Sequence, residues 1–239
     1  MTDARSRVFV ALDVPSLADA IPLMDTVKGT VGGVKIGNQL FTAAGPPAVE
    51  AAHSRGFRVF LDLKLHDIPN TVAGAVREAA RLGVFMLNVH ASGGRAMMRA
   101  AAEAAAKAAT ELGVERPLCL GVTVLTSLDR RALQLEAGVA NTVEAHVLHL
   151  ATAARDAGLA GCVASPQEIT PLRLALGSAW VIVTPGIRPS GPADDQVRTA
   201  SAAAAVRAGA DYLVVGRPIT QAGDPAAAAA ALVAEIAGA

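Results

Sequence analysis

Short runs rich in Val, Leu and Ile alternate along this chain with longer alanine-rich stretches, and this alternation limits the possible folds more than any other feature. Such runs are typical of buried strands, and the stretches between them are typical of helices. Eight runs occur, at residues 7–13, 33–37, 58–64, 85–91, 118–125, 161–165, 180–186 and 211–216. Because repeated strand–helix units make neighbouring strands parallel, the order predicts a parallel sheet covered by helices.

The ends of the helices are marked by small and polar residues. Ser16, Asn141 and Ser165 each stand three residues before an acidic side chain, which is typical of the residue that caps a helix start. Six runs are preceded by a glycine that suits the left-handed end of a helix, at positions 56, 83, 113, 158, 177 and 209. The alanine-rich stretches at 100–109 and 226–237 are therefore predicted to be helices rather than linkers.

Eight strand–helix units close most economically into a (β/α)8 barrel, the TIM barrel of the α/β class. We expect residues 1–239 to form one such domain, because barrels of this length are routinely single domains. An open doubly wound sheet is the alternative. No G-x-G-x-x-G follows the first run, which weakens that alternative.

The charge balance argues against two classes of partner. Lys plus Arg and Asp plus Glu both number 21, so the net charge is zero. Such a chain has no overall field to attract nucleic acid or an anionic membrane, and neither is an expected partner. The start of the chain resembles neither a signal peptide nor a membrane span, which predicts a cytoplasmic protein. Cys119 and Cys162 lie in apolar runs and are expected to be small core residues.

The segment FLDLKLHDIPNTV, residues 60–72, places charges in an apolar strand. Side chains alternate between the two faces of a strand, so the leucines share one face while Asp62 and Lys64 share the other. One interpretation is a structural ion pair at a strand end, and the other is an active site.

The positions of other charges favour the active site. Asp13, Lys35, Asp62 and Lys64 all fall at or near the C-terminal ends of predicted strands, where the sites of TIM barrels lie. Because a desolvated charge is unfavourable unless it is paired, a purely structural protein would have little reason to gather four of them there.

Two further segments indicate a phosphate site. Gly216 and Arg217 end the last run, where backbone N–H groups and a guanidinium suit a phosphate dianion. The segment 184–196, rich in Pro and Gly, is long for a connection between a strand and a helix. Taken alone it is a surface excursion, whereas beside Arg217 it is better interpreted as a lid over the phosphate.

These motifs, taken in order, resemble those of the orotidine 5'-phosphate decarboxylase family. They are DLKLHDIPNT at 62–71, ALD at 11–13, VKIG at 34–37, LTS at 125–127, TPGIRP at 184–189 and VGRPI at 215–219. The resemblance spans the whole chain and implies decarboxylation of orotidine 5'-monophosphate to uridine 5'-monophosphate and CO2, the final step of de novo UMP biosynthesis. It further implies that the reaction needs neither cofactor nor metal.

The resemblance also assigns roles to individual residues. Lys64 matches the proton donor, and Asp62 matches its partner beside the substrate carboxylate. Asp67 is implied as a further catalytic residue, and together with Thr71 it matches positions that reach across a homodimer interface into the other subunit's site.

The remaining matches bind substrate: Asp13 and Lys35 for the ribose, Thr126 for the pyrimidine, and Arg188, Gln196, Gly216 and Arg217 for the phosphate. The loop at 190–194 departs from the family pattern, because it is a residue shorter than usual.

Two alternatives remain open. One is a magnesium-dependent sugar-phosphate decarboxylase or aldolase of the same barrel superfamily, which shares the D-x-K-x-x-D spacing but resembles its own relatives in carrying an acidic residue near the position of Lys35. A lysine there would repel the metal. The other is a non-catalytic phosphate-binding barrel, which would bind uridine monophosphate without turning substrate over.

Overall fold

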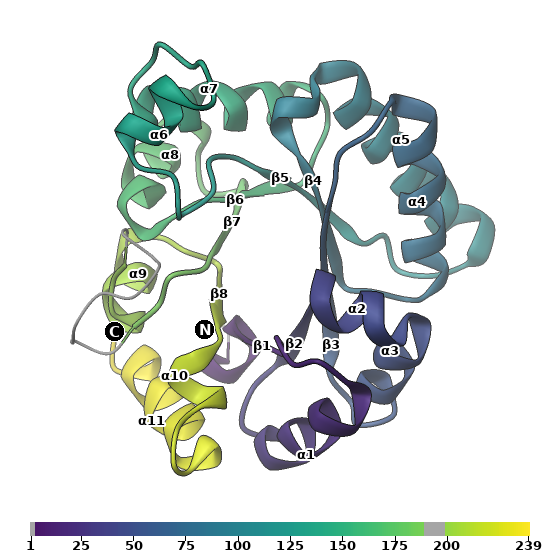
Figure 1. Cartoon of the computed structure of the whole chain (residues 1–239), viewed down its shortest axis with the longest axis vertical. Coiled ribbons are helices and arrows are strands. Elements are labelled where there is room, and N and C mark those ends of the chain that lie inside the picture. Colours follow the sequence, from purple (N-terminus) through teal and green to yellow (C-terminus); the bar gives the residue numbers. More distant parts are fainter. Residues whose placement is uncertain (1–2, 189–198) are drawn as a thin grey trace.

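The eight strands form one closed parallel barrel in which each strand pairs with the next and β8 returns to β1 (Figure 1). The computed structural model describes residues 3–188 and 199–239. The strands are β1 (Val8–Ala11), β2 (Gly33–Gly37), β3 (Arg58–Leu65), β4 (Met86–His90), β5 (Leu118–Val122), β6 (Gly161–Val163), β7 (Val181–Thr184) and β8 (Tyr212–Val215). All eight predicted strands are confirmed, and the closed barrel excludes the open sheet.

Helices form an outer ring around the strands (Figure 1). They are α1 (Leu17–Val27), α2 (Asn38–Ala44), α3 (Pro46–His53), α4 (Pro69–Arg81), α5 (Arg95–Leu112), α6 (Arg130–Leu135), α7 (Val143–Asp156), α8 (Ile169–Leu176), α9 (Ala202–Ala208), α10 (Arg217–Thr220) and α11 (Pro225–Ala237). Short 3-10 helices occur at η1 (Ala4–Arg7), η2 (Ala91–Gly93) and η3 (Pro166–Glu168). The alanine-rich stretches lie in α5 and α11, as predicted.

The predicted helix ends are confirmed with one exception. All six glycines have positive φ, and Ser16 caps α1 by accepting a hydrogen bond from Asp19 N at 3.2 Å. Asn141 was the wrong cap for α7. Thr142 is the capping residue instead, because its hydroxyl is one residue closer to the helix and accepts from Ala145 N at 3.2 Å.

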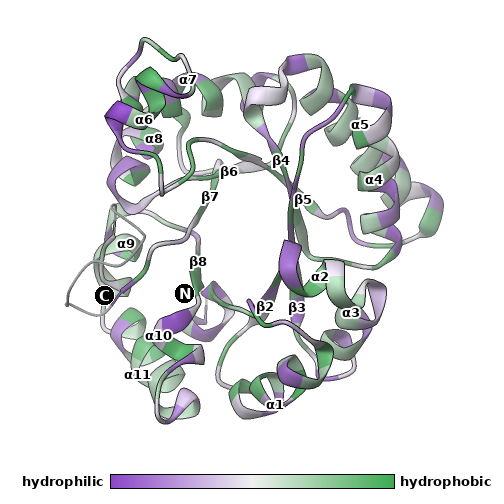
Figure 2. Cartoon of the chain, in the orientation of Figure 1, coloured by the Kyte–Doolittle hydropathy of each residue, from purple (hydrophilic) through white to green (hydrophobic). Residues whose placement is uncertain are grey.

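The apolar core has two parts, one inside the barrel and one between the barrel and the helices. The inner part is built on Phe9, Phe60, Met86, Leu120 and Val183. The outer part is larger and includes the inner faces of the helices. Helices α4 and α5 carry both hydrophobic and hydrophilic residues (Figure 2), and the residues that they bury are apolar. Packing of this kind fills the barrel, so it is not a pore.

Both cysteines belong to the outer part of the core, as expected. Cys119 and Cys162 are buried free thiols. Burial raises the pKa of each thiol to about 12, which makes both poor nucleophiles at neutral pH.

Aromatic rings and one arginine close the N-terminal end of the barrel. Phe9 and Phe85 stack with ring centroids 6.0 Å apart, and Tyr212 meets both edge-on. The Arg58 guanidinium lies 4.3 Å from the Phe85 ring centroid, a cation–π contact.

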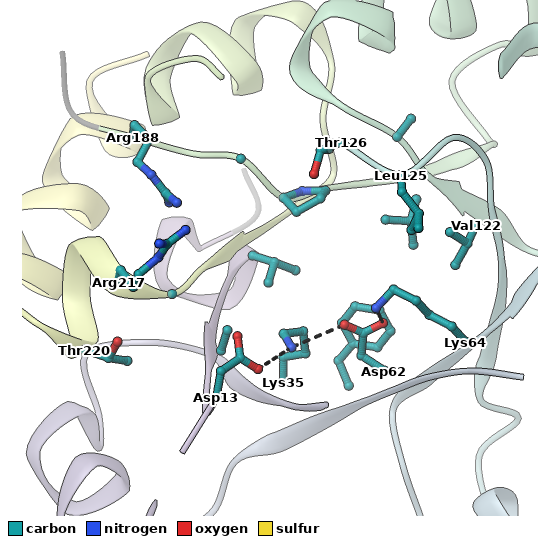
Figure 3. Close-up of a pocket in the computed structure, with 18 of the residues that line it drawn as sticks. Asp13, Lys35, Asp62, Lys64, Val122, Leu125, Thr126, Arg188, Arg217 and Thr220 are labelled. Atoms are coloured by element: carbon teal, nitrogen blue, oxygen red, sulfur yellow. Dashed lines mark hydrogen bonds and ion pairs between the residues drawn. The ribbon is translucent and has the colours of Figure 1, made fainter. Parts of the chain in front are cut away.

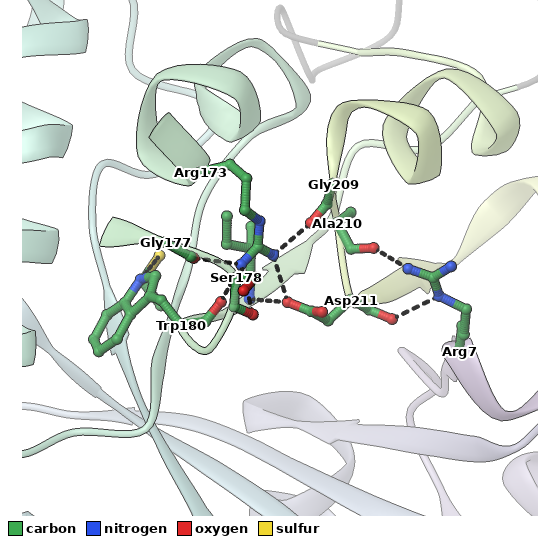
Figure 4. Close-up of polar contacts among 10 residues, drawn as sticks. Arg7, Arg173, Gly177, Ser178, Trp180, Gly209, Ala210 and Asp211 are labelled. Carbon is green, nitrogen blue, oxygen red and sulfur yellow. Dashed lines mark hydrogen bonds and ion pairs between the residues drawn. The ribbon is translucent and has the colours of Figure 1, made fainter. Parts of the chain in front are cut away.

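A second arginine joins the chain segments that enter the last two strands (Figure 4). From α8, Arg173 donates to the carbonyl oxygens of Gly177 at 2.8 Å and Trp180 at 2.7 Å, and to the Asp211 carboxylate at 2.7 Å. Asp211 in turn accepts from Ile182 N in β7 at 2.8 Å. The network holds the entry to β7 and the entry to β8 together.

No helix in the part of the chain that the structure describes combines the length and the apolar character needed to cross a membrane.

Candidate active site

A cavity of about 420 Å³ opens at the C-terminal ends of the strands (Figure 3). Its floor is the top of the inner core, where Ala11, Phe60, Val163 and Val214 line it. Its described charged lining residues are two acidic, Asp13 and Asp62, and four basic, Lys35, Lys64, Arg188 and Arg217, an excess of two positive charges. An apolar floor below a positive wall suits a flat ring that carries an anionic group.

Four of these side chains form a line of alternating charge. The Lys35 ammonium lies 2.9 Å from Asp13 Oδ1 and 3.3 Å from Asp62 Oδ2. The Lys64 ammonium lies 2.7 Å from Asp62 Oδ1. We call Asp13, Lys35, Asp62 and Lys64 the charge array. Because neighbours differ in sign, each charge is stabilised by the next, which matters most for the side chains of Lys35 and Asp62, each only 10% exposed.

Strands β1, β2 and β3 bring the array together. Ala11 pairs with Lys35, and Gly37 pairs with Asp62. Asp13, two residues beyond the end of β1, therefore lies level with Gly37 and Asp62, beside Lys35. Gly37 leaves room for these side chains, because a Cβ atom there would lie 2.9 Å from Lys35 Nζ and the lysine would have to shift. The outward face of β3 carries Leu61, Leu63 and Leu65, which line a separate apolar cavity. The predicted alternation along β3 is thus confirmed.

Lys64 departs from ordinary strand geometry. It has a φ of 51°, which makes it the one non-glycine residue with positive φ in the described parts of the chain. The pairing of β3 with β4 also shifts here, since Leu61 pairs with Leu87 and Leu65 with Val89. A long side chain held in a left-handed conformation is typical of a functional site.

Asn88 of β4 occupies this irregularity. Its Nδ2 donates to Asp62 Oδ1 at 2.7 Å, and its Oδ1 accepts from Lys64 N at 2.8 Å. Asn88 is only 1% exposed. Asn88 lies in the predicted run 85–91, and sequence reasoning gave it no role. Its contacts depend on the register between β3 and β4, for which the sequence offers no signal.

The charge array keeps the carboxylate of Asp62 ionised. Burial alone would raise the pKa of Asp62, but Lys35, Lys64 and the Asn88 hydrogen bond outweigh it and hold that pKa below its usual range. Burial likewise opposes the charge of Lys35, and the carboxylates of Asp62 and Asp13 raise the pKa of Lys35 above its ordinary value. Both groups are therefore charged at neutral pH.

The residues expected to bind the phosphate lie across the cavity from Lys64 (Figure 3). Arg188 and Arg217 point into the cavity from the chain after β7 and from the start of α10, and Gly216 lines it beside Arg217. Thr126, expected near the pyrimidine, lines the wall in the loop after β5. Gln196 and most of the expected lid lie outside the described residues.

Two expected site residues are not brought into the cavity. Asp67 and Thr71 are exposed, and the cavity lining within this chain includes neither. The Asp67 carboxylate accepts instead from Ile68 N at 2.6 Å. Ile68 is itself 67% exposed, a large apolar side chain left on the surface beside the site.

The acidic residues that the structure describes do not gather as a metal centre would require. Within residues 3–188 and 199–239, no three His, Cys, Asp or Glu side chains are grouped closely enough to hold a metal ion. Asp13 and Asp62, the two carboxylates among the described lining residues of the cavity, are bridged by the Lys35 ammonium, which would repel a cation.

Comparison with known proteins points to one family. The model of the orotidine 5'-phosphate decarboxylase / HUMPS family matches residues 6–232. The chain is 55% identical over 234 residues to the orotidine 5'-phosphate decarboxylase of Moorella thermoacetica, covering 98% of this chain and 93% of the relative. It is also 55% identical over 234 residues to that of Halorhodospira halophila, covering 98% and 97%.

Solved structures agree with these sequence matches. Orotidine 5'-phosphate decarboxylase from Lactobacillus acidophilus superposes with a TM-score of 0.85 at 36% identity, over 96% of this chain and 98% of that one. An uncharacterized conserved protein from Geobacillus kaustophilus superposes with a TM-score of 0.84 at 38% identity, over 96% and 99%.

Proposed function

Because the chain belongs to the orotidine 5'-phosphate decarboxylase / HUMPS family, we propose that it converts orotidine 5'-monophosphate to uridine 5'-monophosphate and CO2, the final step of de novo UMP biosynthesis. The observation that carries the proposal is the charge array, which faces two arginines across one cavity. The excess of positive charge suits a substrate that has both a phosphate and a carboxylate.

Loss of CO2 from C6 of the pyrimidine leaves an electron pair in the plane of the ring, where the ring cannot delocalise it. The barrier therefore falls only if charge is placed beside C6 before the bond breaks. In our proposal the ammonium of Lys64 stabilises this carbanion and then protonates it. Asp62 lies beside the departing carboxylate and holds Lys64 in place at 2.7 Å. No cofactor takes part in these steps.

Binding energy far from C6 supports the same step. Arg188, Gly216 and Arg217 are assigned to the phosphate, together with Gln196 on the strength of the resemblance. Asp13 and Lys35 are assigned to the ribose, and Thr126 to the pyrimidine. Contacts to a distant phosphate can align the ring over the array, so a substrate without phosphate should lose rate as well as affinity.

The site is completed by a second subunit in our proposal. Asp67 and Thr71 act across a homodimer interface, with Asp67 as a further catalytic carboxylate. Their exposure next to the catalytic strand supports this, as does the exposed side chain of Ile68. We also propose that residues 1–239 form one domain, supported by the single closed barrel, and that the enzyme works in the cytoplasm on a small nucleotide.

Replacement of Lys64 tests the mechanism. Lys64→Ala should keep the fold and bind uridine monophosphate, but kcat should fall by roughly 10³-fold or more, because the group that stabilises and protonates the carbanion is lost. Loss of the ultraviolet absorbance of orotidine monophosphate measures turnover. Lys107→Ala, an exposed lysine on α5, is the matched control.

Near-normal turnover by Lys64→Ala would contradict the mechanism. The wild-type assay is repeated with a chelator, since a requirement for magnesium would favour the sugar-phosphate alternative. Binding of uridine monophosphate without any turnover by the wild type would favour a phosphate-binding barrel.

A further inference from the structure

The contact between β3 and β4 is interrupted at one point, beside the charge array. Leu61 pairs with Leu87 and Leu65 pairs with Val89. Residues 62–64 of β3 therefore lie opposite a single residue of β4, Asn88. The regular exchange of backbone hydrogen bonds stops over this stretch, which contains both Asp62 and Lys64.

The side chain of Asn88 links the two strands where the backbone ladder does not. The amide N–H donates to the Asp62 carboxylate at 2.7 Å, and the amide oxygen accepts from Lys64 N at 2.8 Å. The orientation of the amide follows from its partners, since a carboxylate can only accept and a backbone N–H can only donate. One buried side chain thus contacts both members of the Lys64–Asp62 pair.

These contacts form a closed ring of interactions. The ring runs from Lys64 N through the Asn88 amide to Asp62 Oδ1, and from there across 2.7 Å to Lys64 Nζ. The left-handed φ of 51° at Lys64 belongs to the same ring. A backbone conformation that a long side chain disfavours persists only where its surroundings hold it.

We infer that Asn88 is a positioning residue, whose amide holds the backbone of Lys64 and the carboxylate of Asp62 so that the Lys64 ammonium points at the reacting carbon. The inference rests on the proposed role of Lys64. Asn88 is 1% exposed and does not belong to the described lining of the cavity, so it acts through its two neighbours and not by touching the substrate.

Asn88→Leu provides the first test, because leucine has a similar size and removes both hydrogen bonds. We expect kcat to fall by about 10²-fold, since displacement of a reacting group by about 1 Å has effects of that order. The Kd for uridine monophosphate, measured by calorimetry, should change by less than about threefold, because the proposed phosphate and ribose contacts remain. A crystal structure should show Lys64 Nζ moved from its position 2.7 Å from Asp62 Oδ1.

Thr123→Val is the matched control. Thr123 is also a buried polar residue, directly after β5, and its hydroxyl donates to Val163 O at 2.8 Å. This substitution likewise replaces a polar group with an apolar one of similar shape, but Thr123 contacts no member of the charge array and does not belong to the described lining of the cavity. Its kcat should stay within about twofold of the wild type, since the Lys64–Asp62 pair keeps all its contacts.

Asn88→Asp gives a signature that a structural role would not produce. The new carboxylate can still accept from Lys64 N, but it faces the Asp62 carboxylate until one of them binds a proton. Protonation restores a donor to Asp62, so kcat of this variant should rise as the pH falls from about 8 to about 5, a range over which Asp62 of the wild type stays ionised. The other charged groups facing Asp62 are Lys35 from β2, Lys64 from β3 and, at longer range, His90 from β4.

The outcomes separate the inference from the proposed function. A kcat within threefold of the wild type in Asn88→Leu, with or without lower thermal stability, would overturn the inference, as would a pH profile of Asn88→Asp parallel to that of the wild type. If Asn88→Leu does not fold, the profile of Asn88→Asp decides. Should Lys64→Ala keep its turnover, the proposed role of Lys64 fails, and the role given to Asn88 fails with it. Should the wild type not decarboxylate orotidine monophosphate, the proposed function fails whatever Asn88 does.

Discussion

At the scale of the residue, the electrostatics of the site centre on Asp62. Its two oxygens interact with Lys35, Lys64 and Asn88 at 3.3, 2.7 and 2.7 Å. A buried carboxylate without these partners would bind a proton more readily, and a neutral Asp62 could no longer hold the ammonium of Lys64. The charge of this one side chain therefore depends on its neighbours on both adjacent strands.

Removal of Lys35 should expose this dependence. Burial raises the pKa of Asp62 and Lys35 opposes that effect, so Lys35→Met should raise the pKa of Asp62. The carboxylate would then begin to bind a proton at higher pH, and the acidic limb of the kcat/KM profile should move to higher pH, even though overall activity is lower. The profile is measured by the decarboxylation assay across the acidic range.

Arg55→Met is the control for this experiment. Arg55 pairs with the exposed Asp25 at 2.7 Å, away from the cavity, and its loss should leave the limb in place. If the acidic limb of the kcat/KM profile also stays in place in Lys35→Met, Lys35 does not set the pKa of Asp62.

The residues of the charge array could be predicted from sequence, but the contacts and backbone conformation that hold them in place could not. Alternation along β3 places Asp62 and Lys64 on one face by local geometry alone. The left-handed backbone of Lys64 and the contacts of Asn88 depend instead on how far β4 is shifted along β3, which is a property of two segments in space.

At the scale of the element, the last two βα units are fastened at the end of the barrel opposite to the site. Arg173 joins α8 to the segments that precede β7 and β8 (Figure 4). Its side chain is 20% exposed, and that of Asp211 is 36% exposed. Such a partly buried pair, reinforced by bonds to backbone carbonyls, is stronger than a surface ion pair.

Arg173→Met should therefore destabilise the protein without changing the chemistry. The carbonyl oxygens of Gly177 and Trp180 lose a donor and Asp211 loses its partner, so the free energy of unfolding should fall by about 2 to 3 kcal/mol. Urea denaturation measures the change. The kcat of the folded variant at 25 °C should match the wild type, since the network lies away from the cavity.

The comparison is with Arg81→Met, which breaks an exposed pair with Glu78 within α4. That change should alter the free energy of unfolding by less than about 0.5 kcal/mol. Equal effects of the two substitutions would show that the Arg173 network adds nothing to stability.

Strand order and most helix ends could be predicted because their signals are local. The glycines before the strands and Ser16 act through their own backbone neighbourhood. The cap of α7 was misassigned because Asn141 and Thr142 are both good capping residues and are adjacent. The Arg173 network joins residues that are far apart in sequence, so no local sequence pattern predicts it.

At the scale of the whole molecule, the proposed homodimer makes a quantitative prediction. If Asp62 acts within its own subunit and Asp67 acts in the partner, a heterodimer of Asp62→Ala and Asp67→Ala subunits has one intact site and one doubly altered site. An equal mixture that exchanges freely should recover about a quarter of wild-type activity, because half of the dimers are mixed. Activity is measured after the two inactive variants are mixed and allowed to exchange subunits.

A mixture of Asp62→Ala with Lys64→Ala is the matched control. Both residues belong to one subunit's array, so every site in the mixed dimer lacks one of them and no activity should return. Equal recovery in both mixtures, or none in either, would argue against a shared site.

The rings of Phe9, Phe85 and Tyr212, packed against Arg58, close the N-terminal end of the barrel. The cavity at the other end is therefore a pocket and not a channel through the barrel. The nucleotide substrate, CO2 and the nucleotide product must all pass through the same opening, at the C-terminal ends of the strands. CO2 formed while a nucleotide occupies this opening must pass the nucleotide or wait until it leaves, so the order in which the two products depart depends on the shape of the cavity as well as on their affinities.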